Sequence, residues 1–290
     1  MKISKTLIRL SYLVVLLTVI ATLVGLFLPG GKGPFTFTTL HGKTVDMYGS
    51  GLYQNDTVLG AVGYKIGDAS TLILAIPLLL FSLWRYRRGS LRGGILLTGV
   101  FMYLLYYYGS MALGAAYNNL FLIYIVLTSS TFFGLLIAVA SFDQFSLPAR
   151  FSKSLPVRGI SIFLIISGLA LFCIWLFLSI LPALFAGSVP DEVASNTTVI
   201  TFVVDMGLIA PSMVIVGTML SRRAPMGYVL ASIFLVFIDV LGLALLAMGI
   251  RQEVAGLMKI GQFIGFVVSF AILTLFSLGF TASLFRNISD

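Results

Sequence analysis

The sequence predicts an all-α membrane protein, a bundle of eight transmembrane helices that forms a single domain over residues 1–290. The composition is the first reason: 59% of the residues are hydrophobic and 10% are charged, whereas about a quarter are charged in a typical soluble domain. Apolar runs of about 20 residues recur along the chain, which is the length that spans a bilayer. The net charge of +8 comes from short basic clusters between these runs, so we expect no nucleic-acid partner.

Turn residues and charges separate the predicted spans. The first span follows a basic start, as in a signal peptide, but its apolar stretch from about Leu10 to Leu28 is long for one and lacks a clear cleavage site. We therefore expect an uncleaved first helix. A proline-bearing connector at 144–158 separates the fourth span from the fifth. The predicted spans are 8–28, 69–86, 92–115, 119–141, 159–186, 198–220, 227–249 and 261–285.

The distribution of lysine and arginine predicts the orientation of the bundle. With eight spans, both termini lie on one side, and thirteen of the 18 basic residues then share that side. Cytoplasmic loops carry an excess of basic residues, so we expect an integral protein of the cell (inner or plasma) membrane with both termini in the cytoplasm. The five basic residues left outside are Lys32, Lys43, Lys65, Arg251 and Lys259.

The segment 29–67, between the first two spans, is too long to be a plain connector. Residues 35–40 and 43–48 alternate in polarity around His41-Gly42, which is the pattern of a β-hairpin. The aromatic and apolar content of the segment argues against disorder. We therefore predict an ordered extracytoplasmic lid over the outer mouth of the bundle.

Two aspartates interrupt apolar runs and are the strongest indication of function. Asp205 lies in the sixth predicted span and Asp239 near the centre of the seventh. An ionisable group at membrane depth is costly, and it usually faces the bundle interior or a wet cavity and has a partner there. Asp205 shares a predicted helical face with Thr201, near the interruption expected at Pro211. This face is interpreted either as a polar pocket or as a bonding point between helices.

Asp239 has no lysine or arginine at its predicted depth. Its expected partners are hydroxyl groups, or Asp205 through a shared proton. A proton relay and a neutral carboxylic acid that joins two helices are both consistent with the pattern.

Four further residues complete the predicted ligand-binding pocket. Asp68 stands at the predicted outer boundary of the second span, and Tyr117 and Asn118 follow a tyrosine-rich face of the third. Gln262 begins the eighth span. The tyrosine-rich face predicts either the wall of a pocket for a lipid, quinone or pigment headgroup or an aromatic belt at the membrane interface.

Histidine and cysteine are too rare for most metal centres. The single histidine, His41, and the single cysteine, Cys173, exclude a bis-histidine haem, a histidine zinc site and a cysteine cluster within one chain. No metal is predicted, and no cofactor is indicated. His41 with Asp46 or Asp56 could form an outer-leaflet site acting on a lipid or a lipophilic cofactor, but the pattern favours a solvated turn histidine, since no nucleophile accompanies these residues.

Three stretches resemble a group of uncharacterised bacterial multi-pass membrane proteins. They are GKTVDMYGSGLYQNDTVLGA, YGSMALGAAYNNLFLIYIVL and VDMGLIAPSMVIVGTMLSRRAPMGYVLA. The resemblance implies a bacterial membrane protein and supplies no reaction. It covers Tyr117, Asn118, Asp205 and Pro211, with Asp68 just downstream of the first stretch, and leaves Asp239 outside.

The leading functional hypothesis is a protein that binds or transports a small polar or cationic molecule or ion through an outward-facing pocket. The alternatives are a non-catalytic accessory or assembly subunit, with a membrane-protein partner or a homo-oligomer, and the outer-leaflet enzyme. The shortage of catalytic residues favours a protein that is not an enzyme.

Overall fold

The computed structural model describes residues 1–143 and 147–289. Eight helical segments within these residues are long and apolar enough to cross a membrane, which agrees with the predicted number of spans. The first residues of the predicted connector, 144–146, lie outside the described residues. The eight segments are Lys5–Phe27, Val58–Arg87, Leu91–Gly114, Phe121–Ala140, Val157–Phe185, Phe202–Ser221, Pro225–Val254 and Ile260–Arg286.

Several segments consist of more than one element. The elements are, in chain order, α1 (Lys5–Phe27), β1 (Phe35–Thr38), β2 (Thr44–Met47), α2 (Val58–Ser70), η1 (Thr71–Ala75), α3 (Ile76–Arg87), α4 (Leu91–Gly114), α5 (Phe121–Ala140), η2 (Leu147–Arg150), α6 (Val157–Trp175), η3 (Leu176–Ile180), α7 (Leu181–Phe185), η4 (Asp191–Val193), η5 (Phe202–Ile209), α8 (Ala210–Ser221), α9 (Pro225–Val254) and α10 (Ile260–Arg286).

Proline explains where the long helices change their winding. The π-helical segments η1, η3 and η5 each end two residues before a proline: Pro77, Pro182 and Pro211. A proline has no N–H to donate and clashes with the carbonyl one turn earlier. The wider i→i+5 winding of a π-helix accommodates that defect without breaking the helix. The helices therefore continue past each proline, but their side chains are rotated relative to a regular α-helix.

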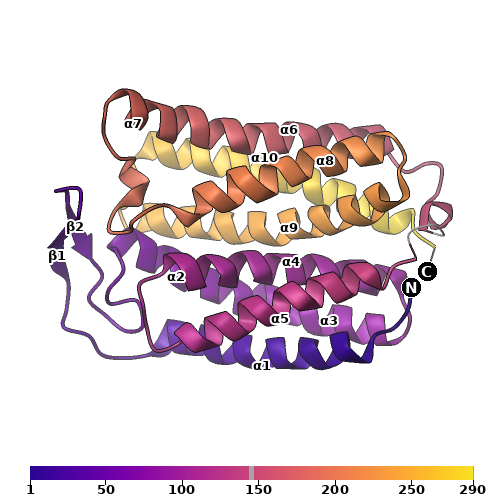
Figure 1. Cartoon of the computed structure of the whole chain (residues 1–290), viewed down its shortest axis with the longest axis horizontal. Helices are drawn as coiled ribbons and strands as arrows, with labels where there is room; N and C mark the ends of the chain where they lie inside the picture. Colours follow the sequence, from indigo (N-terminus) through magenta and orange to yellow (C-terminus); the bar gives the residue numbers. More distant parts are fainter. Residues whose placement is uncertain (144–146, 290) are drawn as a thin grey trace.

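The helices form two groups, α1–α5 and α6–α10, which lie side by side (Figure 1). The groups meet where α2 and α4 pack on α9. Most of α9 is buried, whereas most of α10 and of the α6–α7 segment faces outward with apolar side chains. An apolar outer surface of this kind suits contact with lipid tails, and the architecture is that of a multi-pass membrane protein.

The two ends of the bundle are distinct. Figure 1 shows both chain termini at one end, called here the terminal end, and the β-hairpin at the other, called the hairpin end. The hairpin confirms the predicted strands, with Phe35 paired to Met47 and Thr38 to Thr44. Its turn is longer than the predicted two residues, because Thr39 N donates to Lys43 O and the turn spans 39–43.

The segment that follows the hairpin folds into the bundle. Residues 48–57 double back, with Tyr48 N donating to Asp56 O and Gly49 N to Gln54 O. At the tip of this loop, Leu52 and Tyr53 are buried. We call residues 29–57 the lid. The lid thus consists of an exposed hairpin and the loop 48–57. We call this loop the plug, because its tip is buried between the helices.

Candidate functional site

Asp68 lies inside a helix that begins at Val58, well before the predicted start of the second span at residue 69. The Thr57 hydroxyl accepts from Gly60 N and caps a helix that begins at Val58. Asp68 is therefore about 15 Å along that helix, at 1.5 Å per residue. The early start was missed because the glycine-rich segment 58–68 carries a weak apolar signal.

Two tyrosines hold the carboxylate of Asp68. Tyr53, from the lid, donates to Oδ2 at 2.6 Å, and Tyr107, from α4, donates to Oδ1 at 3.0 Å. Asp68 is 2% exposed. Burial, reinforced by the nearby Asp68 carboxylate, raises the pKa of the Tyr53 hydroxyl, which therefore stays a hydrogen-bond donor. Gly25 of α1 leaves the space for this pair, since a Cβ there would overlap the Asp68 carboxylate.

Further tyrosines surround the Asp68 carboxylate. Tyr53 packs on Tyr64 with ring centroids 5.4 Å apart, and Tyr107 stacks on Tyr103 at 6.2 Å. Among the described residues, the buried hydroxyls of Tyr108, Tyr124 and Thr18 have no hydrogen-bond partner. We call the group the tyrosine cluster; its members are Tyr53, Tyr64, Tyr103, Tyr107, Tyr108 and Tyr124. The predicted aromatic belt at the interface is thus largely an interior feature.

Asp205 occupies a second, separate site. Tyr106 donates to its Oδ1 at 2.9 Å and the Trp175 indole N–H donates to its Oδ2 at 2.9 Å. Asp205 lies in the π-helical segment η5, and Trp175 ends α6 just before η3. Both carboxylate oxygens are satisfied by groups from membrane-length helices, so Asp205 joins α4, α6 and η5.

Helix α4 links the two carboxylates through adjacent residues. Tyr106 points to Asp205 and Tyr107 points to Asp68. Because consecutive residues are about 100° apart around a helix, the two aspartates lie on different sides of α4. The structure thus holds the two carboxylates through different residues of α4, and a single pocket that contains both stays a prediction.

Asp239 forms a third site, in the middle of α9. It is 7% exposed and lies beside Ser277 and Thr281 of α10. Its Oδ1 has no hydrogen-bond partner within the part of the chain that the structure describes. The structure thus agrees with the expectation that hydroxyl groups neighbour this carboxylate, and it leaves one oxygen unsatisfied.

Tyr117 and Gln262 do not join these sites, whereas Asn118 lies beside one of them. Tyr117 is 77% exposed and packs on Phe121, and Gln262 is exposed, where its Oε1 accepts from Lys259 N at the start of α10. Asn118 borders the tyrosine cluster beside Tyr124, but its hydrogen bonds are local, to Ala116 and Leu120.

Thr201 stands directly before η5, and the hydrogen bonds to Asp205 come from Tyr106 and Trp175. His41 is exposed in the hairpin turn. Asp56, in contrast, is buried, and its Oδ1 accepts from Ala116 N at 2.8 Å. No group of three or more histidine, cysteine, aspartate or glutamate residues among those described could hold a metal ion.

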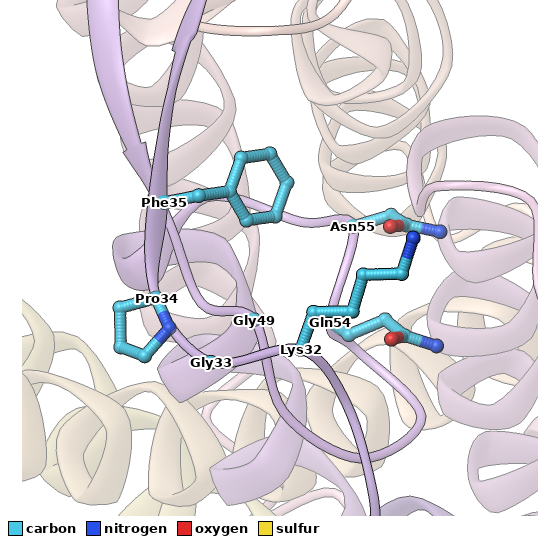
Figure 2. Close-up of a pocket in the computed structure, with 7 residues that line it drawn as sticks. All are labelled: Lys32, Gly33, Pro34, Phe35, Gly49, Gln54 and Asn55. Carbon is cyan, nitrogen blue, oxygen red and sulfur yellow. The ribbon is translucent and has the colours of Figure 1, made fainter.

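A pocket of about 560 Å³ lies at the hairpin end. Figure 2 shows Lys32, Gln54 and Asn55 on one side of it and Phe35 on another. All its lining residues belong to the lid, and Asp68, Asp205 and Asp239 do not border it. Asp68 is almost fully buried, so its site is closed in this structure, with Tyr53 donating to the carboxylate.

Two residues central to these sites were missed in the sequence. Tyr53 lies in an irregular part of the lid, where only its aromatic character suggested order. Trp175 lies in a continuous apolar run, and nothing in the local sequence indicates that its N–H meets Asp205. Comparison of the chain with protein-family models, with curated proteins and with solved structures gives no match.

Proposed function

We propose that this protein binds and transports a small organic cation, such as a protonated amine, across the cell membrane, and that the structure is its closed form. The observation that carries the proposal is the Asp68 carboxylate, buried and held by Tyr53 of the lid at 2.6 Å. Ionisable groups at membrane depth commonly mark substrate or ion pathways.

The chemistry around Asp68 suits an organic cation. A carboxylate neutralises an ammonium group, and tyrosine rings attract it through their electron-rich faces. The tyrosine cluster places five tyrosines near the Asp68 carboxylate, with Tyr64 packed behind Tyr53. The buried hydroxyls of Tyr108 and Tyr124 have no partner within hydrogen-bond geometry among the described residues. A bound ligand with N–H or polar groups would satisfy them.

Tyr53 gives the site a route for entry. It belongs to the lid, whereas the second partner, Tyr107, belongs to α4. Withdrawal of the plug would free one carboxylate oxygen and the space that the Tyr53 ring fills. The ligand N–H would then take the place of the Tyr53 O–H at Oδ2.

We assign the ligand-holding role to Asp68 rather than to Asp205. Both oxygens of Asp205 are satisfied by Tyr106 and Trp175, and neither partner comes from the lid. Asp205 therefore holds neighbouring helices together through hydrogen bonds. Because its site does not involve the lid, an Asp205 variant is a matched control for an Asp68 variant.

The orientation in this proposal places both termini in the cytoplasm and the lid outside. The excess of basic residues at the terminal end supports it. The Asp68 site would then open toward the outside of the cell when the lid lifts.

Thermal unfolding of the detergent-purified protein tests the proposal. Tetramethylammonium chloride and ethanolamine hydrochloride are the probes, compared with sodium chloride at equal ionic strength. We expect at least one probe to raise the Tm in a saturable manner, because a ligand that binds the folded state stabilises it. The rise should disappear in Asp68→Asn and persist in Asp205→Asn.

A second variant covers the case in which Asp68→Asn fails to fold. Tyr53→Phe keeps the ring and removes the competing O–H, so it should bind the same probe more tightly than the wild type. Absence of stabilisation by either probe in both the wild type and Tyr53→Phe would contradict the proposal, as would unchanged stabilisation in Asp68→Asn.

A further inference from the structure

Three of the four buried residues of α10 carry a hydroxyl group. The buried residues of this helix are Thr274, Ser277, Thr281 and Leu284. The first three are spaced i, i+3 and i+7, so they form one stripe. Helix α10 packs on α9, and Gly242 of α9 allows a close approach to Thr274. A polar seam therefore runs between two helices whose other faces are apolar.

Asp239 of α9 lies on this seam beside Ser277 and Thr281. Thr274 donates to Phe270 O at 2.6 Å, and Ser277 donates to Leu235 O at 3.1 Å. In contrast, Asp239 Oδ1 and Thr281 Oγ1 are buried and have no hydrogen-bond partner among the described residues. Two unsatisfied oxygens thus occur on the same seam, beside the Ser277 hydroxyl.

We propose that Asp239, Ser277 and Thr281 form a binding site for a dehydrated monovalent metal cation, with sodium as the expected ion. Hydroxyl and carboxylate oxygens are the ligands that hard cations prefer. One carboxylate balances one positive charge, and Asp239 forms no ion pair with any of the described residues. A divalent ion would leave an uncompensated charge between α9 and α10.

Simple adhesion between helices accounts for the seam less well. A neutral carboxylic acid that joined α9 to α10 would donate its proton to a hydroxyl or a carbonyl. Ser277 and Thr281 lie close to Asp239, but among the described residues Asp239 Oδ1 and Thr281 Oγ1 have no partner within hydrogen-bond geometry, although both residues are more than nine-tenths buried. Burying unsatisfied polar atoms in this way is costly, and a bound cation would remove the cost.

Equilibrium binding of radioactive sodium ion to the detergent-purified protein tests this site. We expect saturable binding to the wild type, displaced by unlabelled sodium and not by N-methyl-D-glucamine. Asp239→Asn should abolish the binding, and Thr281→Val should weaken it about tenfold. Thr274→Val is the matched control, because its hydroxyl is already bonded to Phe270 O, and it should bind as the wild type does.

The result is independent of the proposed transport function, since Asp68→Asn should leave sodium binding intact. If Asp239→Asn does not fold, the comparison of sodium binding between Thr281→Val and Thr274→Val still tests the site. Absence of saturable sodium binding to the wild type would overturn the inference. Equal sodium binding by wild type and Asp239→Asn, or equal losses in Thr281→Val and Thr274→Val, would do so as well.

Discussion

At the scale of single residues, the Asp68 carboxylate depends on the absence of a side chain at Gly25. A Cβ at this position would overlap Asp68 and crowd the Tyr53 hydroxyl. The pair of Tyr53 and Asp68 is buried, so neither side chain can move into solvent to make room. A single methyl group added at Gly25 would therefore disturb the packing of Asp68 and Tyr53.

We predict that Gly25→Ala lowers the free energy of unfolding by about 1–3 kcal/mol, as overpacking commonly does. Gly265→Ala is the control, because a Cβ there meets nothing within 4 Å, and it should be neutral or slightly stabilising given the higher helix propensity of alanine. Denaturant unfolding of both variants in detergent measures the difference. Equal stability of the two variants would show that Asp68 is not held as described.

At the scale of elements, the prolines determine which way the polar side chains point. The segment η5 ends two residues before Pro211 and contains Asp205. With an ordinary residue at 211, the regular α-helical hydrogen bonds become available again. Residues before position 211 would then rotate and carry the Asp205 carboxylate away from Trp175.

Trp175 and Trp84 are the two tryptophans of the chain, so a Trp84→Phe background leaves Trp175 as the reporter. In that background we expect Pro211→Ala to shift the Trp175 emission to shorter wavelength, because the indole loses its charged acceptor. Pro225→Ala is the control, since Pro225 opens α9 with no π-helical segment before it. An unchanged spectrum in Pro211→Ala, alongside a shifted one in Asp205→Ala, would contradict this role for the proline.

The lid carries its own titratable group. Asp56 accepts from Ala116 N at 2.8 Å through Oδ1, while Oδ2 is buried without a partner in the described structure. Burial raises the pKa of Asp56 to about 6, although the Ala116 hydrogen bond opposes the shift. The folded lid thus binds a proton more tightly than the unfolded chain does.

Stability falls as pH rises wherever the folded state binds more protons than the unfolded state. We therefore predict that the lid loses stability between about pH 4 and pH 6, and that it is more open at pH 7 than at pH 5. The total change is at most about 3 kcal/mol, from about 1.4 kcal/mol per unit of pKa shift. Hydrogen exchange of residues 48–57, corrected for its intrinsic pH dependence, measures it.

Asp56→Asn keeps the acceptor for Ala116 and cannot titrate, so it should make the exchange of residues 48–57 independent of pH in this range. A pH dependence that persists in Asp56→Asn would assign the effect to another group.

The sequence was informative about elements and less so about contacts. Apolar runs predict the membrane helices because the length and hydrophobicity of a span are visible in one continuous stretch of sequence. The hairpin pattern around Gly42 is visible in the same way. The Asp68 site was misjudged because its partners come from the lid and from α4, which lie 15 and 39 residues away along the chain. The surroundings of Asp205 could not be predicted from one helical face, because its partners Tyr106 and Trp175 come from α4 and α6.

At the scale of the whole molecule, the orientation of the bundle is open to a direct test. In a Cys173→Ala background, His41→Cys marks the hairpin end and Ser289→Cys marks the terminal end. We predict that a membrane-impermeant maleimide labels His41→Cys in intact cells and labels Ser289→Cys only after permeabilisation. The reverse pattern would place the lid in the cytoplasm and overturn the proposed direction of ligand entry.

The central claim is that Asp68 and the lid enclose a site for a small organic cation. Native mass spectrometry of the protein, gently extracted from its own membrane, tests it most directly. We predict a bound small molecule with a basic nitrogen on the wild-type chain and on Asp205→Asn, and its loss from Asp68→Asn. A wild-type chain that carries a stoichiometric protein partner and no small molecule, or an adduct retained by Asp68→Asn, would contradict the account.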